Sequence, residues 1–282
     1  MKLYILTYHS HHVVGDTYAQ NDHVAFPIDL DIITESGYRI VPLATLVERF
    51  LAFSRRGVLE DDRYVAITFD DGPVFDVDDF DHPVYGAQSS FLRAMRQFHD
   101  TRGRSAQPEL HATAFVIASP IARRTMEQHA DPQYTFLTPG SLDDSWWNRA
   151  IDSRLIGIAN HSFDHLHPAL ADVAHSRGAR GDFTQVDNED DADAQILAAS
   201  IYIAARTGGR ASRFFAYPFG HWNDFLANEY LPAKRDTIGV DAAFTTEPRA
   251  IRATDSRWLL PRLTCGHHWT TPQELRDILS AE

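Results

Sequence analysis

The chain has 282 residues, of which 44% are hydrophobic and 11% are aromatic, and its formal net charge is −13. A chain of this size and apolar content can bury a sizeable core, which excludes an intrinsically disordered protein. The negative charge argues against a protein that binds nucleic-acid phosphates or a membrane surface through basic residues. The single cysteine, Cys265, excludes an intrachain disulfide and a CxxC zinc site.

The first residues, MKLYILTYHSHHVVGD, predict a β-strand over residues 3–8 rather than a signal peptide. Their apolar run is shorter than a signal-peptide core, and no cleavage site of small residues follows it. No stretch of the chain approaches the roughly 20 apolar residues that a membrane-spanning helix needs. We therefore expect a cytoplasmic protein without a transmembrane segment.

Short apolar strands alternate with helices along the chain, which predicts a parallel sheet or barrel. The apolar runs predict extended segments over residues 3–8, 38–41, 64–69, 112–118, 155–159, 214–217, 242–246 and 258–263. The helical patterns cover residues 29–36, 43–53, 89–99, 121–128, 143–153, 192–206 and 271–279. Two polar segments, 74–86 and 172–190, are predicted to be surface inserts. Repeats and linkers are absent from the sequence, so we expect a single domain over residues 1–282.

Histidines and carboxylates recur directly after the predicted strands. In parallel α/β folds, functional side chains gather at the carboxyl ends of the strands. These groups are therefore expected to meet at one edge of the sheet. They are His9, Asp70 and Asp71, Asn160 with His161 and His165, Tyr217 with Pro218 and Gly220, and His267 with His268.

The adjacent carboxylates Asp70 and Asp71 end a strand that reads as buried, VAITF. Like charges repel at this spacing and burial of either is costly, and a bound cation would remove the conflict. His161 and His165 are four residues apart, so on one helical turn both imidazoles would reach the same ion. Two histidines and one aspartate suit Zn²⁺ or another divalent transition metal, and the second aspartate can then act as a general base. Taken alone, either motif is also typical of a turn or of a structural histidine pair.

Three motifs in order, ITFDDGP, NHSFDH and FAYPFG, resemble those of the polysaccharide deacetylase family, carbohydrate esterases that remove N- or O-acetyl groups from sugars. The segments TYHS, ESGYRIVPL, HATAFVIA, LIGIANHS and AAFTTEP are also similar to that family, so the resemblance covers most of the chain. It implies an α/β fold, a distorted (β/α) barrel of about seven parallel strands with surface inserts. It also implies a metal-dependent mechanism.

The resemblance gives roles to the matching residues of this chain. Asp70 would be the general base. Asp71, His161 and His165 would bind one divalent ion, most simply Zn²⁺. The backbone N–H of Phe219 would help to bind the oxyanion, as a donor aimed at developing negative charge.

One departure concerns the arginine that orients the base in many members, near the start of the third motif. In this chain Ala216 stands at that place. Arg213 or Arg262 could replace the arginine, and Arg262 is preferred because it ends a predicted strand.

A second departure concerns the general acid, because LTC stands where the family has a Leu-x-His motif. His9 in TYHS is the favoured acid, and some exopolysaccharide deacetylases of the family carry such a Tyr-His pair. His267, or its neighbour His268, is the alternative. His11 and His12 are expected to lie in solvent.

These features predict a metal-dependent hydrolase that removes acetyl groups from an N-acetylated sugar or polysaccharide precursor. Two alternatives remain: a hydrolase of another non-peptide C–N bond in a small molecule, and a non-catalytic carbohydrate-binding barrel. The paired aspartates and histidines favour an enzyme, since a dead site has no physical need for all four. Tryptophans can stack on sugar rings, although core packing is expected for at least half of the four candidates, which are Trp146, Trp147, Trp222 and Trp269.

Overall fold

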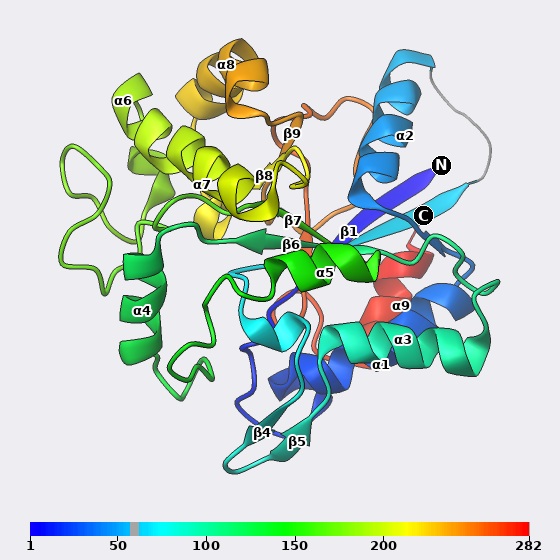
Figure 1. Cartoon of the computed structure of the whole chain (residues 1–282). Coiled ribbons are helices and arrows are strands. Elements are labelled where there is room, and N and C mark those ends of the chain that lie inside the picture. The colour runs from blue at the N-terminus through cyan, green and yellow to red at the C-terminus, as the bar shows by residue number, and fades with distance from the viewer. Residues whose placement is uncertain (57–61, 282) are drawn as a thin grey trace.

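The computed structural model describes residues 1–56 and 62–281, and it is organised around one curled sheet (Figure 1). Seven strands follow each other in the order β10-β1-β3-β6-β7-β8-β9, and each neighbouring pair is parallel. A short strand, β2 (Arg39–Ile40), pairs with the first half of β3. The other strands are β1 (Lys2–Tyr8), β3 (Arg63–Phe69), β6 (Ala112–Val116), β7 (Ile156–Asn160), β8 (Phe214–Ala216), β9 (Ala242–Phe244) and β10 (Leu263–Thr264).

The two ends of this sheet are joined through the segment that leads into β10. Leu260 forms an isolated parallel bridge with Phe244 of β9, and β10 then pairs with Leu6 and Thr7 of β1. The sheet therefore curls into the predicted distorted barrel of about seven parallel strands. The strand predicted over residues 258–263 is wrong in its extent, because Pro261 has no N–H to donate and pairing resumes only after it.

Helices cover the outside of the barrel, and α1, α3 and α9 pack side by side (Figure 1). Local capping explains where several of them begin. Ser90 caps α3, Ser119 caps α4 with Pro120 in its first turn, and Thr271 forms a capping box with Glu274 in α9. The helices are α1 (Asp22–Glu35), α2 (Leu43–Arg56), α3 (Phe91–Arg102), α4 (Pro120–Gln128), α5 (Trp147–Ser153), α6 (Glu189–Ala192), α7 (Ala198–Thr207), α8 (Leu231–Ile238) and α9 (Pro272–Ser280).

Several element boundaries differ from the sequence-based expectations. The helix predicted over residues 29–36 begins earlier in the structure, because α1 starts at Asp22, where the Asn21 side chain accepts from the N–H of His23. The insert over residues 74–86 contributes to an antiparallel hairpin of β4 (Phe80–His82) and β5 (Gly86–Gln88) rather than remaining irregular. Helix α8 and the π-helical turn before it were not predicted.

The tryptophans divide between the core and the surface. Trp146, Trp147 and Trp269 are buried in the main hydrophobic core, whereas Trp222 is 40% exposed. Trp222 is therefore the one of the four candidates that is free to stack on a sugar. Among the described residues, no helix combines the length and the apolar character needed to cross a bilayer.

Candidate active site

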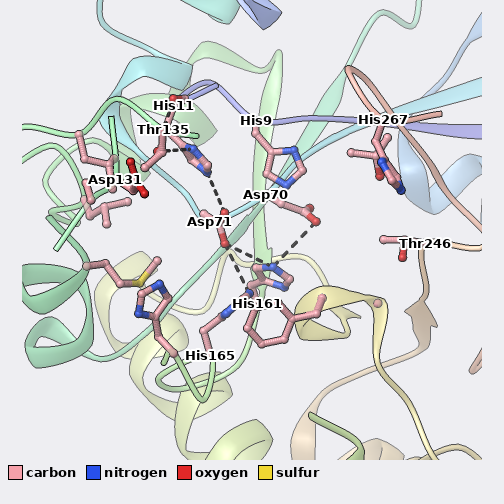
Figure 2. A pocket seen from close by; sticks show the side chains of 18 of the residues that line it. His9, His11, Asp70, Asp71, Asp131, Thr135, His161, His165, Thr246 and His267 are labelled. Carbon is pink, nitrogen blue, oxygen red and sulfur yellow. Dashed lines mark hydrogen bonds and ion pairs between the residues drawn. The ribbon is translucent and has the colours of Figure 1, made fainter. Parts of the chain in front are cut away.

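A cavity of about 630 Å³ lies at the carboxyl ends of the parallel strands. Figure 2 shows side chains from several strand ends converging on it. The parallel register brings these ends to the same edge of the barrel, although the residues are far apart in the sequence. The lining includes His9 after β1, Asp70 and Asp71 after β3, His161 and His165 after β7, Phe219 after β8, Thr246 after β9, and Thr264, His267 and His268 at the end of β10.

Asp71, His161 and His165 form a compact group in the middle of this cavity (Figure 2). Each offers one ligand atom, and these atoms lie within 4.8 Å of one another. Asp71 Oδ1 is 3.6 Å from His161 Nε2 and 3.6 Å from His165 Nε2. Ligands held at about 2.0–2.2 Å around a tetrahedral ion would lie about 3.4 Å apart, so the spacing fits one divalent ion.

The backbone between the two histidines is a tight loop and not a helix, which corrects the helical interpretation of HxxxH. Ser162 and His165 both have positive φ, at 73° and 63°. The side chain of Asn160 accepts from the Ser162 N–H, and the Ser162 hydroxyl accepts from the His165 N–H at 3.0 Å. These side-chain contacts replace the helical turn and still aim both imidazoles at Asp71.

The hydrogen bonds of this group leave His161 Nε2 and Asp71 Oδ1 free to bind a cation. His161 Nδ1 lies 2.9 Å from the carbonyl oxygen of Ala216, so Nδ1 carries the hydrogen and Nε2 presents a lone pair. Asp71 Oδ1 and His165 Nδ1 are buried, and neither has a hydrogen-bond partner in the described part of the chain. Unpaired buried polar atoms are costly, and a bound cation is one way to satisfy Asp71 Oδ1.

The charge states of Asp71 and His165 are also those that a metal requires. Burial tends to raise the pKa of Asp71, but the hydrogen bond from His11 and the nearby His165 hold that pKa well below its usual value. Burial lowers the pKa of His165 to about 3. At neutral pH Asp71 therefore offers a carboxylate and His165 a neutral imidazole, the donor forms that bind divalent transition metals.

Asp70 lies beside this group and forms a bidentate ion pair with Arg262. The two bonds are Nη1 to Oδ1 at 2.7 Å and Nη2 to Oδ2 at 2.8 Å, and the Arg262 side chain is fully buried. Burial tends to raise the pKa of Asp70, but the charge and hydrogen bonds of Arg262, together with the nearby His161 and His9, outweigh burial and lower the pKa. Arg213 lies elsewhere, exposed and paired with Asp241, so the structure places Arg262, and not Arg213, against the expected base.

The candidates for the general acid differ in their surroundings. The His9 ring lines the cavity, where burial lowers its pKa against the opposing charges of Asp71 and Asp70. His267 is exposed at the rim, and His268 Nδ1 accepts from the Thr264 N–H at 2.7 Å. Of these three candidates for the general acid, His9 is the one whose pKa is influenced by the two aspartates.

Phe219 follows β8 and forms part of the cavity wall next to the histidines. Its φ is 59°, a left-handed conformation that is uncommon for a large side chain. Its ring packs edge-on against that of His165, with centroids 4.4 Å apart.

Two histidines that were expected in solvent make partly buried contacts with carboxylates instead. His11 Nε2 lies 2.8 Å from Asp71 Oδ2, and His12 Nδ1 lies 2.7 Å from Oδ1 of the buried Asp22. The expectation was wrong. The chain turns directly after β1, where the His12 N–H donates to the His9 carbonyl oxygen at 2.8 Å, and no pattern in the sequence marks this turn.

Part of the cavity wall comes from a segment that the sequence did not identify as functional. Asp131, Thr135 and Leu137 line the cavity, and the Phe136 N–H donates to the carbonyl oxygen of His11 at 2.7 Å. No motif marks this segment, because its position depends on tertiary contacts with the end of β1.

No protein-family model matches the chain, and no curated protein is similar to it in sequence. Solved structures do match in fold. The deacetylase PplD of Streptococcus pyogenes, in complex with acetate, is 15% identical with a TM-score of 0.59, over 100% of this chain and 99% of that one. IcaB of Ammonifex degensii is 16% identical with a TM-score of 0.61, over 100% of both chains. A de-N-acetylase of Aggregatibacter actinomycetemcomitans is 16% identical with a TM-score of 0.58, over 98% of this chain and 100% of that one.

These structures match along nearly their whole lengths, so the likeness concerns the complete barrel and not one motif. The predicted resemblance to the polysaccharide deacetylases is thereby confirmed at the level of the fold. The chain has the fold of these deacetylases.

Proposed function

We propose that the protein is a metal-dependent hydrolase that removes an acetyl group from the nitrogen of an N-acetylated sugar, in a polysaccharide or in its precursor. The observation that carries the proposal is a three-ligand group, Asp71, His161 and His165, next to the ionised carboxylate of Asp70. The fold shared with proteins named as deacetylases supports the class of reaction. A cytoplasmic location remains a prediction from the sequence.

Each residue of the cavity would have a different role in hydrolysis. The three ligands would hold one divalent ion, most simply Zn²⁺, which when bound polarises a carbonyl oxygen and lowers the pKa of water. Asp70, anchored through both oxygens by Arg262, would take a proton from the attacking water. The backbone N–H of Phe219 would donate to the oxygen on which negative charge develops. His9 would give a proton to the nitrogen as the C–N bond breaks, so that acetate and a free amine leave.

Two other functions are compatible with parts of the site. A hydrolase of another amide would use the same ligands and base, and a non-catalytic carbohydrate-binding barrel would use only the cavity. The buried pair of Asp70 and Arg262 favours catalysis, because a buried ion pair is often no better for stability than apolar side chains of similar volume. An ionised base held at this position has an evident use in hydrolysis.

The proposal is tested by measuring metal content and acetate release on the same purified protein. We expect one divalent ion per chain by elemental analysis, and acetate release from at least one member of a panel of N-acetylated sugars and oligosaccharides. A chelator should abolish the release, and added Zn²⁺ should restore it. Sugar binding without acetate release would favour the non-catalytic barrel, and release of another acid from a small amide would favour the other hydrolase.

The role of His9 can be separated from that of His267 by matched replacements with glutamine. We expect His9→Gln to lower kcat by about 10²–10⁴-fold, the usual contribution of a positioned acid. An acid is active when protonated, so the wild-type rate should fall as pH rises through the pKa of His9, and this fall should be absent in His9→Gln. His267→Gln serves as the control and should keep both rate and pH profile. The reverse pattern would assign the acid to His267.

A further inference from the structure

His11 contacts the metal-ligand group without belonging to it. Its Nε2 lies 2.8 Å from Oδ2 of Asp71, while the other oxygen of that carboxylate, Oδ1, faces His161 and His165 (Figure 2). The carboxylate of Asp71 is therefore shared, with one oxygen toward the ligand histidines and the other toward His11. This division fixes the rotation of the carboxylate about its last bond.

The second nitrogen of His11 is engaged as well, and this determines where the ring hydrogen lies. A carboxylate can only accept, so Nε2 carries the hydrogen and Nδ1 of the neutral ring is an acceptor. The hydroxyl of Thr135 lies 2.8 Å from Nδ1 and is placed to donate to it. Thr135 therefore stabilises the tautomer that points a donor at Asp71.

His11 is also held by its backbone, which makes it a rigid support. Its carbonyl oxygen accepts from the Phe136 N–H at 2.7 Å, and its ring packs edge-on against that of His9, with centroids 5.5 Å apart. The same segment supplies Asp131, Thr135 and Leu137 to the cavity wall. One histidine thus joins the metal ligand Asp71 to the wall that a substrate would contact.

We propose that His11 is a positioning residue for the metal centre: it orients Asp71 so that Oδ1 is presented to the ion, and Thr135 fixes the His11 tautomer that does so. The proposal rests on the metal site of the proposed function. The hydrogen-bonded chain from Thr135 through His11 to Asp71 would then hold Asp71 Oδ1 toward the ion. Partners of this kind typically change metal affinity by about 10–100-fold when they are lost.

Metal affinity, measured by competition with a chromophoric chelator, tests this directly. We expect His11→Leu to weaken Zn²⁺ binding by about 10–100-fold. His11→Gln keeps an N–H donor near the place of Nε2 and should recover a large part of the loss. Thr135→Val removes only the hydroxyl that fixes the His11 tautomer. It should therefore also weaken Zn²⁺ binding, but by less than His11→Leu does. His12→Gln is the control. His12 follows His11 but contacts Asp22 and not Asp71, so this variant should bind Zn²⁺ as the wild type does.

Two further readouts separate positioning from a merely structural role. With Co²⁺ in place of Zn²⁺, the visible spectrum should change in His11→Leu and return toward the wild type in His11→Gln. The rise in melting temperature on adding Zn²⁺ should shrink in His11→Leu, because that rise follows the affinity of the folded protein. A structural role instead predicts a lower melting temperature without metal and an unchanged affinity.

The outcomes also distinguish this proposal from the proposed function. Wild-type affinity in His11→Leu, or no recovery in His11→Gln, would overturn the role of His11 whatever the activity. A wild-type protein that binds Zn²⁺ but releases no acetate would contradict the proposed function and leave the His11 effect on affinity intact. A wild-type protein that binds no divalent ion would contradict both.

Discussion

Asp71→Asn is expected to lose bound metal and acetate release together. The change removes the negative charge of the one carboxylate in the ligand group and leaves the size of the side chain unchanged. Asparagine is preferred to alanine because Asp71 has a φ of 70°, a left-handed conformation that asparagine tolerates and that costs other residues about 1–2 kcal/mol. The fall in metal affinity should exceed the roughly 10–100-fold that loss of a supporting partner causes. Elemental analysis after gel filtration, with an acetate assay on the same sample, measures both losses.

Asp78→Asn is the matched control for this prediction. Asp78 is exposed and pairs with Arg149 at 2.7 Å, on the surface of the molecule. We expect its replacement to leave metal content and activity unchanged. Intact mass must be checked in Asp71→Asn, because an asparagine before Gly72 can deamidate and restore the aspartate. A metal-replete and fully active Asp71→Asn protein of correct mass would refute the ligand assignment.

Local patterns in the sequence predicted a parallel sheet or barrel and the edge at which the site lies, and the family resemblance added the distorted barrel. Apolar runs marked the strands, and polar residues directly after them marked the edge at which Asp70, Asp71 and His161 meet. The predicted grouping of Asp71, His161 and His165 did not depend on a helical backbone between the two histidines. The loop at His165 brings the two imidazoles together as a helical turn would have done.

The parts that the sequence did not predict depend on contacts between distant segments. His11 reads as a polar residue after a strand, and only the fold places it against Asp71. The wall that contains Thr135 carries no motif, and it is positioned by bonds to His11. The closure of the barrel depends on Leu260 and β10, where Pro261 interrupts the pattern of a regular strand.

Arg262→Met is expected to destabilise the protein and to reduce turnover. The change leaves Asp70 buried without its cation, and breaking a buried pair in this way costs about 3–5 kcal/mol. Turnover should fall as well, because Asp70 is then neither oriented nor held ionised, and a lost general base costs about 10²–10⁴-fold. The free energy of unfolding is measured by urea denaturation of the metal-free protein, so that metal loss does not contribute. Arg213→Met, which removes an exposed pair with Asp241, is the control and should cost no more than about 1 kcal/mol.

The contribution of Asp70 to the free energy of unfolding should depend on pH in opposite directions in the wild type and in Arg262→Met. In the wild type the pKa of Asp70 is lowered by Arg262, so its contribution is present above the unfolded-state pKa and lost as pH falls through the folded-state value. In Arg262→Met burial would be the main influence and would raise that pKa, so the contribution of Asp70 should be lost as pH rises. The double variant Asp70→Asn/Arg262→Met carries neither charge, so it should recover much of the stability and none of the activity. Equal stability of Arg262→Met and the wild type at neutral pH would show that the ion pair does not hold Asp70 in its ionised state.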